Sequence, residues 1–144
     1  MFLLRSTVCL ALGLLLRTTG TANNIQVANA TLANDNGSAA MIQFDLSWEN
    51  SWRGGGVNNW DAAWVFVKYR TIGGLWQHVR LSNTGHIAPA GSQIDPGLLT
   101  PSSGYNANTN PVIGVFVYRN APGTGAISLP AVQLLWDYAA VGLA

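Results

Sequence analysis

A strict alternation of apolar and polar residues between positions 41 and 48 constrains the fold more than any other feature of the chain. In "MIQFDLSW", Ile42, Phe44, Leu46 and Trp48 fall on one face of an extended backbone, and the polar residues between them fall on the other face. A period of two with one polar face is typical of an antiparallel sheet that covers a core on one side. The pattern therefore predicts a half-buried strand with Trp48 inside.

Similar segments recur along the chain and are separated by residues that favour turns. The expected strands cover residues 24–32, 41–48, 60–70, 75–81, 111–119 and 131–138, and no segment has the period of an amphipathic helix. Asn36-Gly37 is a typical hairpin turn, and residues 82–110 are mostly loop. These features predict an all-β fold, an antiparallel β-sandwich of immunoglobulin or fibronectin III type. The fibronectin III-like variant is favoured because the cysteine pair of antibody domains is absent.

The first 22 residues have the order of a secretory signal peptide. Arg5 precedes an apolar run from Val8 to Leu16, and small residues then lead to a cleavage point after Ala22. The apolar run is shorter than the roughly 20 residues that a membrane span requires. We therefore expect a secreted, periplasmic or cell-surface protein without a membrane span after cleavage. Residues 23–144 would then form a single β-sandwich domain.

The charge and cysteine content of residues 23–144 exclude several classes of protein. The whole chain has seven Lys and Arg against six Asp and Glu, so removal of Arg5 and Arg17 leaves five basic and six acidic residues. A nucleic-acid partner is not expected, because no basic stripe is present to replace the counterions of the phosphates. Cys9 is the only cysteine and leaves with the signal peptide, so neither a disulfide nor a cysteine-based metal site is expected.

Two consecutive glycines at positions 73 and 74 predict a hairpin between the segments 60–70 and 75–81. A two-residue turn pairs Lys68 with Val79, and a four-residue turn pairs it with Gln77, so both registers assign the same faces. The expected buried face consists of Trp64, Phe66, Val79 and Leu81, with Leu75 on the same side. The opposite face is an outer strip of Val65, Val67, Tyr69, Trp76, His78 and Arg80. Such a strip is either a binding surface or a face that another domain or a loop covers.

Four of the six tryptophans lie between residues 47 and 70. The alternation places three tryptophans in the core, namely Trp48, Trp64 and Trp136. Trp52 and Trp60 flank the glycine-rich loop "RGGGVNN", where they either close one end of the fold or stack on a ligand. The candidate ligand- or partner-binding residues are Trp52, Trp60, Tyr69, Trp76, His78 and Arg80.

No set of residues has the spacing of a catalytic or metal-binding motif. His78 and His86 are the only histidines, and their spacing does not place two imidazoles on one metal ion. Glu49 and Asp61 lie next to tryptophans, as acidic residues do in glycosidases, but both fall at borders between strands and loops, where carboxylates cap turns. We therefore expect neither an enzyme nor a bound metal or cofactor.

Several of these segments together resemble a known family. The segments are "QFDLSWENSWR", "NNWDAAWVFVKYR", "WQHVRLSNTGHIAPAGS" and "GVFVYRNAPGTG" with "VQLLWDY". They resemble the amino-terminal region of secreted Bacteroidetes-type proteins that carry a formylglycine-generating-enzyme-like (sulfatase-modifying factor) domain downstream. In such proteins the enzyme-like domain would begin beyond residue 144, so the resemblance implies a truncated frame or a stand-alone copy of the amino-terminal module and transfers no activity.

Two classes of function follow from these observations. The first is a non-catalytic secreted interaction or structural module, accessory to an adjacent or associated enzyme-like domain. The alternative is a carbohydrate-binding module that uses exposed tryptophans to stack on a glycan.

Overall fold

The computed structural model describes residues 23–56, 59–96, 112–140 and 142–143. Within these residues the chain is all-β, every strand pair is antiparallel, and no helix occurs. The strands are β1 (Gln26–Ala33), β2 (Ala39–Arg53), β3 (Ala63–Val65), β4 (Lys68–Tyr69), β5 (Gln77–His78), β6 (Ser92–Pro96), β7 (Val115–Arg119) and β8 (Gly123–Asp137). The all-β prediction is therefore confirmed for the described residues. The expected signal peptide and residues 97–110 of the expected long loop lie outside them.

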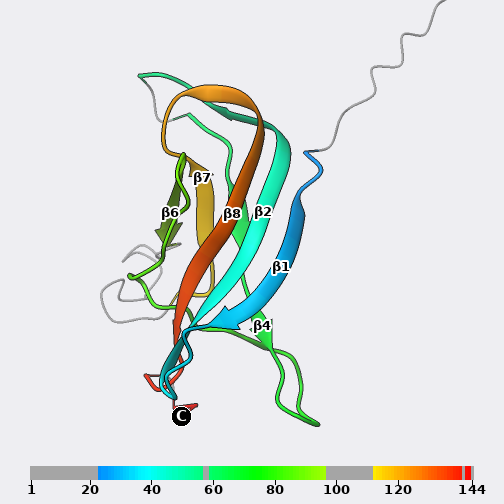
Figure 1. Ribbon diagram of the computed structural model, residues 1–144, viewed down its shortest axis with the longest axis vertical. Helices are drawn as coiled ribbons and strands as arrows, with labels where there is room; N and C mark the ends of the chain where they lie inside the picture. Colours follow the sequence, from blue (N-terminus) through cyan, green and yellow to red (C-terminus); the bar gives the residue numbers. More distant parts are fainter. Residues whose placement is uncertain (1–22, 57–58, 97–111, 141, 144) are drawn as a thin grey trace, which may run out of the picture.

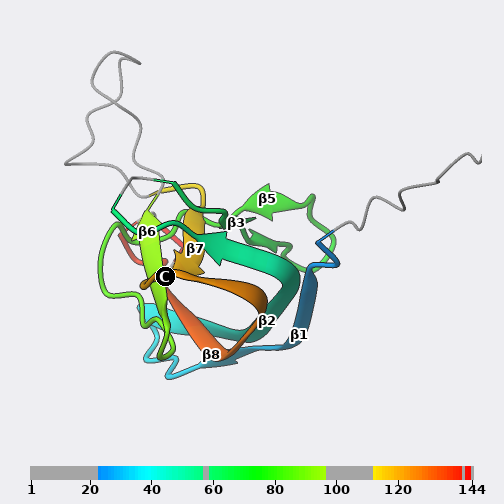
Figure 2. The same cartoon turned by 90° about the horizontal axis from the view of Figure 1, so that it is seen from above.

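The strands form two three-stranded sheets and one two-stranded hairpin. The first sheet has the order β1-β2-β8, the second has the order β3-β7-β6, and β4 pairs with β5. In the first sheet β2 and β8 each span 15 residues and run side by side over their whole length (Figure 1). Figure 2 shows the two larger sheets on opposite sides of the molecule. No helix that is long and apolar enough to cross a membrane occurs in the described part of the chain.

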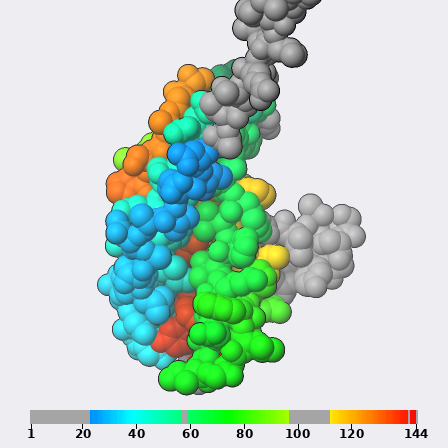
Figure 3. Space-filling view, turned by 90° about the vertical axis from the view of Figure 1, so that its right-hand side faces the viewer, coloured from blue at the N-terminus to red at the C-terminus, as the bar shows by residue number. Residues whose placement is uncertain are grey.

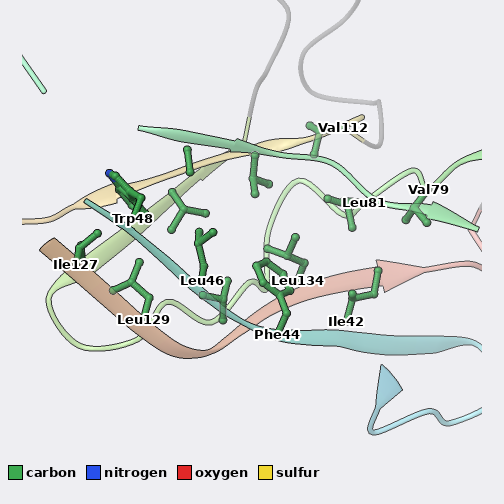
Figure 4. Packing of buried hydrophobic residues seen from close by; sticks show 14 residues of the cluster. Ile42, Phe44, Leu46, Trp48, Val79, Leu81, Val112, Ile127, Leu129 and Leu134 are labelled. Atoms are coloured by element: carbon green, nitrogen blue, oxygen red, sulfur yellow. The ribbon is translucent and has the colours of Figure 1, made fainter. Parts of the chain in front are cut away.

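The alternation in residues 41–48 is confirmed by the burial of its apolar face. Ile42, Phe44, Leu46 and Trp48 are all buried, whereas the polar residues between them remain partly accessible. Their side chains meet apolar residues from β8 and from the second sheet, as Figure 4 shows. The buried partners include Val115, Val117, Leu129, Val132 and Leu134. The core therefore lies between the two larger sheets.

The connection between β1 and β2 covers residues 34–38 and includes Asn36-Gly37, where the sequence predicts a turn. The side-chain Oδ1 of Asn36 accepts hydrogen bonds from the backbone N–H groups of Ser38 and Ala39, at 3.0 and 2.8 Å. Gly37 has a φ of +84°, a conformation that glycine adopts without the strain that a Cβ atom causes. This turn sets the register in which β1 pairs with β2.

The predicted register of the second hairpin is wrong by one residue. Lys68 pairs with His78, rather than with Val79 or Gln77, and the N–H of Val79 donates to the carbonyl of Val67 at 2.8 Å. The reason is the length of the connection between Tyr69 and Gln77, which has an odd number of residues, whereas both predicted turns have an even number. Within this connection the N–H of Gly74 donates to the carbonyl of Thr71 at 3.0 Å. Because side chains alternate along a strand, a shift of one residue exchanges the two faces.

The exchange of faces corrects the predicted core. Trp64 and Phe66 are 41% and 50% exposed, so their assignment to the core is wrong. Val65, Val67 and Tyr69 pack against the core instead, and their assignment to the outer face is wrong. Val79 and Leu81 are buried as predicted, whereas Leu75 is exposed at the end of the hairpin. Trp136 is partly buried against the core, as its position in β8 predicts.

Candidate functional site

A group of aromatic and basic side chains covers the outer face of the second sheet and of the β4–β5 hairpin. Trp64 in β3 lies directly opposite Phe116 in β7, and both are 41% exposed because their neighbours along each strand are the ones that enter the core. The same alternation continues along the chain into the hairpin. We call this surface the aromatic-basic strip, and it consists of Trp64, Phe66, Lys68, Trp76, His78, Arg80 and Phe116.

Ring contacts connect neighbouring residues of the aromatic-basic strip. The ring centroids of Trp64 and Phe116 are 4.6 Å apart with an interplanar angle of 54°. Those of Phe66 and His78 are 5.5 Å apart with an angle of 44°. At the far end, the guanidinium of Arg70 lies 5.2 Å from the centroid of Trp76. The rings are therefore held together at a tilt and do not form one flat surface.

Gly114 provides the space in which the indole of Trp64 lies. A Cβ atom at this position would be 2.5 Å from Cζ2 of Trp64 and 2.8 Å from the carbonyl oxygen of Val65. Since the second of these neighbours is backbone, it could not move aside easily. Glycine at position 114 therefore allows β3 to lie close to the start of β7 with Trp64 flat against it.

The structure brings together three of the six residues that the sequence predicts for binding. Trp76, His78 and Arg80 are exposed and lie on the aromatic-basic strip. Tyr69 faces the interior, where its ring centroid is 5.3 Å from that of Trp136. The other two tryptophans lie at the end of β2, away from the hairpin.

Trp60 is part of a packed cluster at that end of the molecule. Its ring stacks on Tyr118 with a centroid distance of 5.4 Å and an angle of 19°, and the guanidinium of Arg53 lies 4.7 Å from the Trp60 centroid. Burial is the largest effect on the Tyr118 hydroxyl, and together with the negative charge of Asp95 it raises the pKa of that group. Trp52 remains 37% exposed nearby. The cluster supports the interpretation of Trp60 as a closing residue.

Asp61 binds three donors and is therefore a structural residue. Its Oδ2 accepts from the indole Nε1 of Trp48 at 2.7 Å. Its Oδ1 accepts from the backbone N–H of Trp52 at 2.8 Å and from the hydroxyl of Ser51 at 3.2 Å. Glu49 accepts one exposed hydrogen bond, from Asn24 at 3.2 Å. The prediction that Asp61 caps a border between strand and loop is confirmed, whereas the same prediction for Glu49 is wrong because Glu49 lies within β2.

His86 is also held by the fold. Its Nδ1 accepts a hydrogen bond from the N–H of Leu135 in β8 at 3.0 Å, while its Nε2 is buried without a partner. Burial lowers the pKa of His86 below its usual value. The ring borders a shallow hollow of about 420 Å³ between the segment 83–88 and β6. Among the described residues, no three His, Cys, Asp or Glu side chains are grouped in a way that could hold a metal ion.

The charged residues of the described chain are segregated. Two of its basic residues form hydrogen bonds within the fold. Arg119 donates to the hydroxyl of Ser51 and to the carbonyls of Gly125 and Ala126. Arg53 donates to the carbonyl of Arg119. The other three basic residues, Lys68, Arg70 and Arg80, are exposed on the hairpin. Four acidic residues lie on the first sheet or at its turns: Asp35, Asp45, Glu49 and Asp137. The hairpin is therefore the basic end of a molecule whose first sheet is acidic.

Sequence reasoning missed Trp64, Phe66 and Phe116 as surface residues because it used the wrong register. One signal was available: Lys68 has the same parity as Trp64 and Phe66, and a lysine rarely enters a core.

Comparison of the chain with protein-family models, with curated proteins and with solved structures gives no match.

Proposed function

We propose that this protein is a non-catalytic, secreted interaction module that docks through the aromatic-basic strip onto an acidic surface of a partner protein. The observation that carries the proposal is the exposure of Trp64, Phe66 and Phe116, at 41%, 50% and 41%, side by side on one face. Contiguous exposed apolar surface of this kind marks interaction sites. Aromatic and arginine side chains also dominate the binding free energy of protein interfaces.

The charges at the hairpin end of the strip favour an acidic partner, whereas the exposed carboxylate of Asp95 lies opposite Phe116 at the other end. In the part of the chain that the structure describes, neither Lys68 nor Arg80 has an ion-pair partner. Both charges are therefore free to pair with carboxylates of another molecule. Opposite charges across an interface increase the rate of association and exclude partners of the wrong charge.

The ring geometry favours a protein over a glycan. A sugar ring stacks on the open, flat face of an aromatic side chain, whereas the rings here are tilted by 54° and 44° against their neighbours. Trp76 is the most exposed tryptophan, but one side of its ring faces the guanidinium of Arg70. Tilted aromatic residues beside basic ones fit the irregular surface of a folded protein better than a flat saccharide. The test below also measures the carbohydrate-binding alternative.

The architecture proposed for the module is a β-sandwich. Support comes from the core, to which both three-stranded sheets contribute buried residues. The immunoglobulin or fibronectin III type stays a prediction. In that type the last strand lies beside the strand that precedes it, whereas here β8 lies beside β2.

The partner that we propose is an enzyme-like domain of the kind carried by the secreted proteins that the sequence resembles, either adjacent or in a separate chain. The module would then position that domain at the cell surface or in the periplasm. No catalytic step is assigned to the module itself.

The proposal is tested by titrating the chain with a recombinant formylglycine-generating-enzyme-like domain, and separately with soluble polysaccharides, while tryptophan fluorescence is recorded. We expect saturable binding to the protein domain that weakens as salt is added, because exposed charge pairs are screened. Trp64→Ala should weaken binding by about 2 kcal/mol or more, which is roughly 30-fold.

Trp52→Ala is the matched control, because Trp52 is a similarly exposed tryptophan outside the strip. It should leave the dissociation constant unchanged within about twofold. Quenching by a polysaccharide that is lost in Trp76→Ala would instead support the carbohydrate-binding alternative. Equal effects of Trp64→Ala and Trp52→Ala would show that the strip is not the docking surface.

A further inference from the structure

The first strand carries apolar side chains that point toward the core side of its sheet but are not covered. Val27 pairs with Leu46 and Leu32 pairs with Ile42, and both partners on β2 are buried. Val27 and Leu32 share the face of these partners, because directly opposite residues of a sheet point to the same side. Nevertheless they are 59% and 55% exposed. Among the residues that the structure describes, none covers this apolar inner face, so the edge strand is incomplete by itself.

The free edge of β1 lacks the features that usually prevent pairing with another chain. β1 lies at the end of its sheet, with β2 on one side and no described strand on the other. Figure 3 shows its blue residues along the surface of the molecule. The strand reads "QVANATLA" and contains neither a charged residue nor a proline. Natural proteins usually place lysine or proline on an exposed edge to prevent association.

The backbone of β1 has a geometry that can pair with itself. Val27 and Leu32 are five positions apart, yet their partners Leu46 and Ile42 are four apart, because β1 has a bulge between Ala28 and Thr31. Val27 and Leu32 therefore point their side chains to the same face. For the same reason their backbone N–H and C=O groups have the same orientation toward the free edge.

We propose that β1 pairs with β1 of a second copy of this chain, antiparallel, about a two-fold axis between Asn29 and Ala30. In this register Val27 lies opposite Leu32 of the second copy, and Leu32 lies opposite Val27 of the second copy. The two bulges face each other at the axis, and Ala28 lies opposite Thr31 of the second copy. The two three-stranded sheets then form one continuous sheet, with β1 at its centre in each copy.

The charges near the edge are compatible with this pairing. The two strands bring no like charges together, because neither carries a charge. Asp45 is the carboxylate on β2 beside Ala28, and it already accepts hydrogen bonds from Asn29 at 2.7 Å and from the N–H of Ala131 at 2.8 Å. The aromatic-basic strip lies on the other sheet and on the hairpin, so the dimer leaves it accessible and the two proposals can fail separately.

The oligomeric state of the purified protein tests the pairing. Sedimentation equilibrium should give a dimer, and Leu32→Lys should raise the dimer dissociation constant at least roughly 30-fold, because the ammonium group would enter an apolar pair. Ile87→Lys is the matched control, since Ile87 is 53% exposed elsewhere on the surface. It should dimerise as the native chain does. A native chain that stays monomeric at about 100 μM, or a dimer that Leu32→Lys does not affect, would overturn the proposal.

Cross-linking tests the register itself. Ala28→Cys and Thr31→Cys variants are prepared in a Cys9→Ser background, which removes the only native cysteine. Mild oxidation should link a mixture of the two variants by a disulfide, because opposite residues in an antiparallel pair have Cα atoms only about 5 Å apart, within the reach of a disulfide. Each variant alone should cross-link much less. Equal cross-linking of Ala28→Cys alone would contradict the proposed two-fold axis.

Discussion

Asp61 shows how one side chain can hold a border between strand and loop. Its carboxylate connects the indole of Trp48, the hydroxyl of Ser51 and the backbone of Trp52, and two of these three residues are buried. Arg119 also donates to Ser51, at 3.0 Å, so the same group of polar side chains reaches across to β7. The end of β2 is therefore tied to the second sheet by polar contacts as well as by the core.

Replacing Asp61 by alanine should destabilise the protein by about 2–4 kcal/mol, because a buried indole N–H and a backbone N–H lose their acceptor. Urea unfolding followed by tryptophan fluorescence measures this change. Glu49→Ala is the control, since Glu49 is exposed and accepts one exposed hydrogen bond, and it should cost less than about 0.5 kcal/mol. Equal losses for the two variants would show that the Asp61 contacts do not contribute to stability.

The exposure of Trp64 leads to a second prediction at the scale of single residues. Trp64→Ala removes a contact with Phe116 but opens no internal cavity, so it should cost no more than about 1.5 kcal/mol. Leu46→Ala removes a side chain that is 1% exposed and should cost about 2–5 kcal/mol. The same urea unfolding experiment compares them. If Trp64→Ala were the more damaging change, the outward orientation of Trp64 in β3 would be wrong.

At the scale of the elements, a strand was predictable where only one of its faces is apolar. β2 has a single apolar face, so its alternation fixes which side enters the core. The segment from Trp64 to Tyr69 is apolar on both faces, so its orientation depended on the length of the turn after it. A connection of odd length could not be recognised from Gly73 and Gly74 alone, and the faces were exchanged.

The edge position of β1 could not be predicted for a different reason. Its sequence is typical of a half-buried strand, and Val27 and Leu32 do point to the inner side. Their exposure depends on which strand lies opposite, and this is a property of the whole arrangement of sheets. Of the candidate site, Trp76, His78 and Arg80 were predictable. Alternation within 75–81 places them on the other face of the strand from Val79 and Leu81, whichever strand this segment pairs with.

The segment that carries His86 joins β8 through a contact that depends on pH. His86 accepts from the N–H of Leu135 through Nδ1, and the N–H of Ile87 donates to the carbonyl of Gln133 at 2.9 Å. Burial lowers the pKa of His86 in the folded chain below the value of 6.5 for an unfolded one. As the pH falls, the unfolded chain therefore binds a proton first. The contribution of neutral His86 to the free energy of unfolding is complete above about pH 6.5, and it is lost as the pH falls through the folded-state pKa.

Thermal unfolding at pH 7.5 and at pH 5 tests this dependence. The melting temperature of the native chain should be lower at pH 5 than at pH 7.5. His86→Gln should make this difference smaller, because glutamine does not titrate. His78→Gln is the control, since His78 is exposed on the hairpin, and it should keep the native dependence. Asp35 and Asp45 have pKa values lowered from 3.8 by hydrogen bonds, so their contributions are lost only at lower pH. An unchanged fall in His86→Gln would contradict the role of His86.

At the scale of the whole molecule, the separation of charge matters more than the net charge. Residues 23–144 carry five basic and six acidic side chains, so their sum alone predicts weak binding to an anionic surface. The three exposed basic residues nevertheless lie together on the hairpin, while the acidic ones are concentrated on the first sheet. A local field of one sign can direct binding even when the total charge has the other sign.

Cation-exchange chromatography of residues 23–144 at pH 7 and low salt measures this separation. We expect the native chain to be retained, because the hairpin can face the sulfonate groups while the acidic sheet faces away. The double variant Lys68→Ser, Arg80→Ser should elute unretained. The double variant Thr124→Glu, Ser128→Glu changes the net charge by the same amount on β8, and it should still be retained. Equal elution of both variants would mean that net charge alone controls binding, and an acidic partner for the aromatic-basic strip would lose its electrostatic basis.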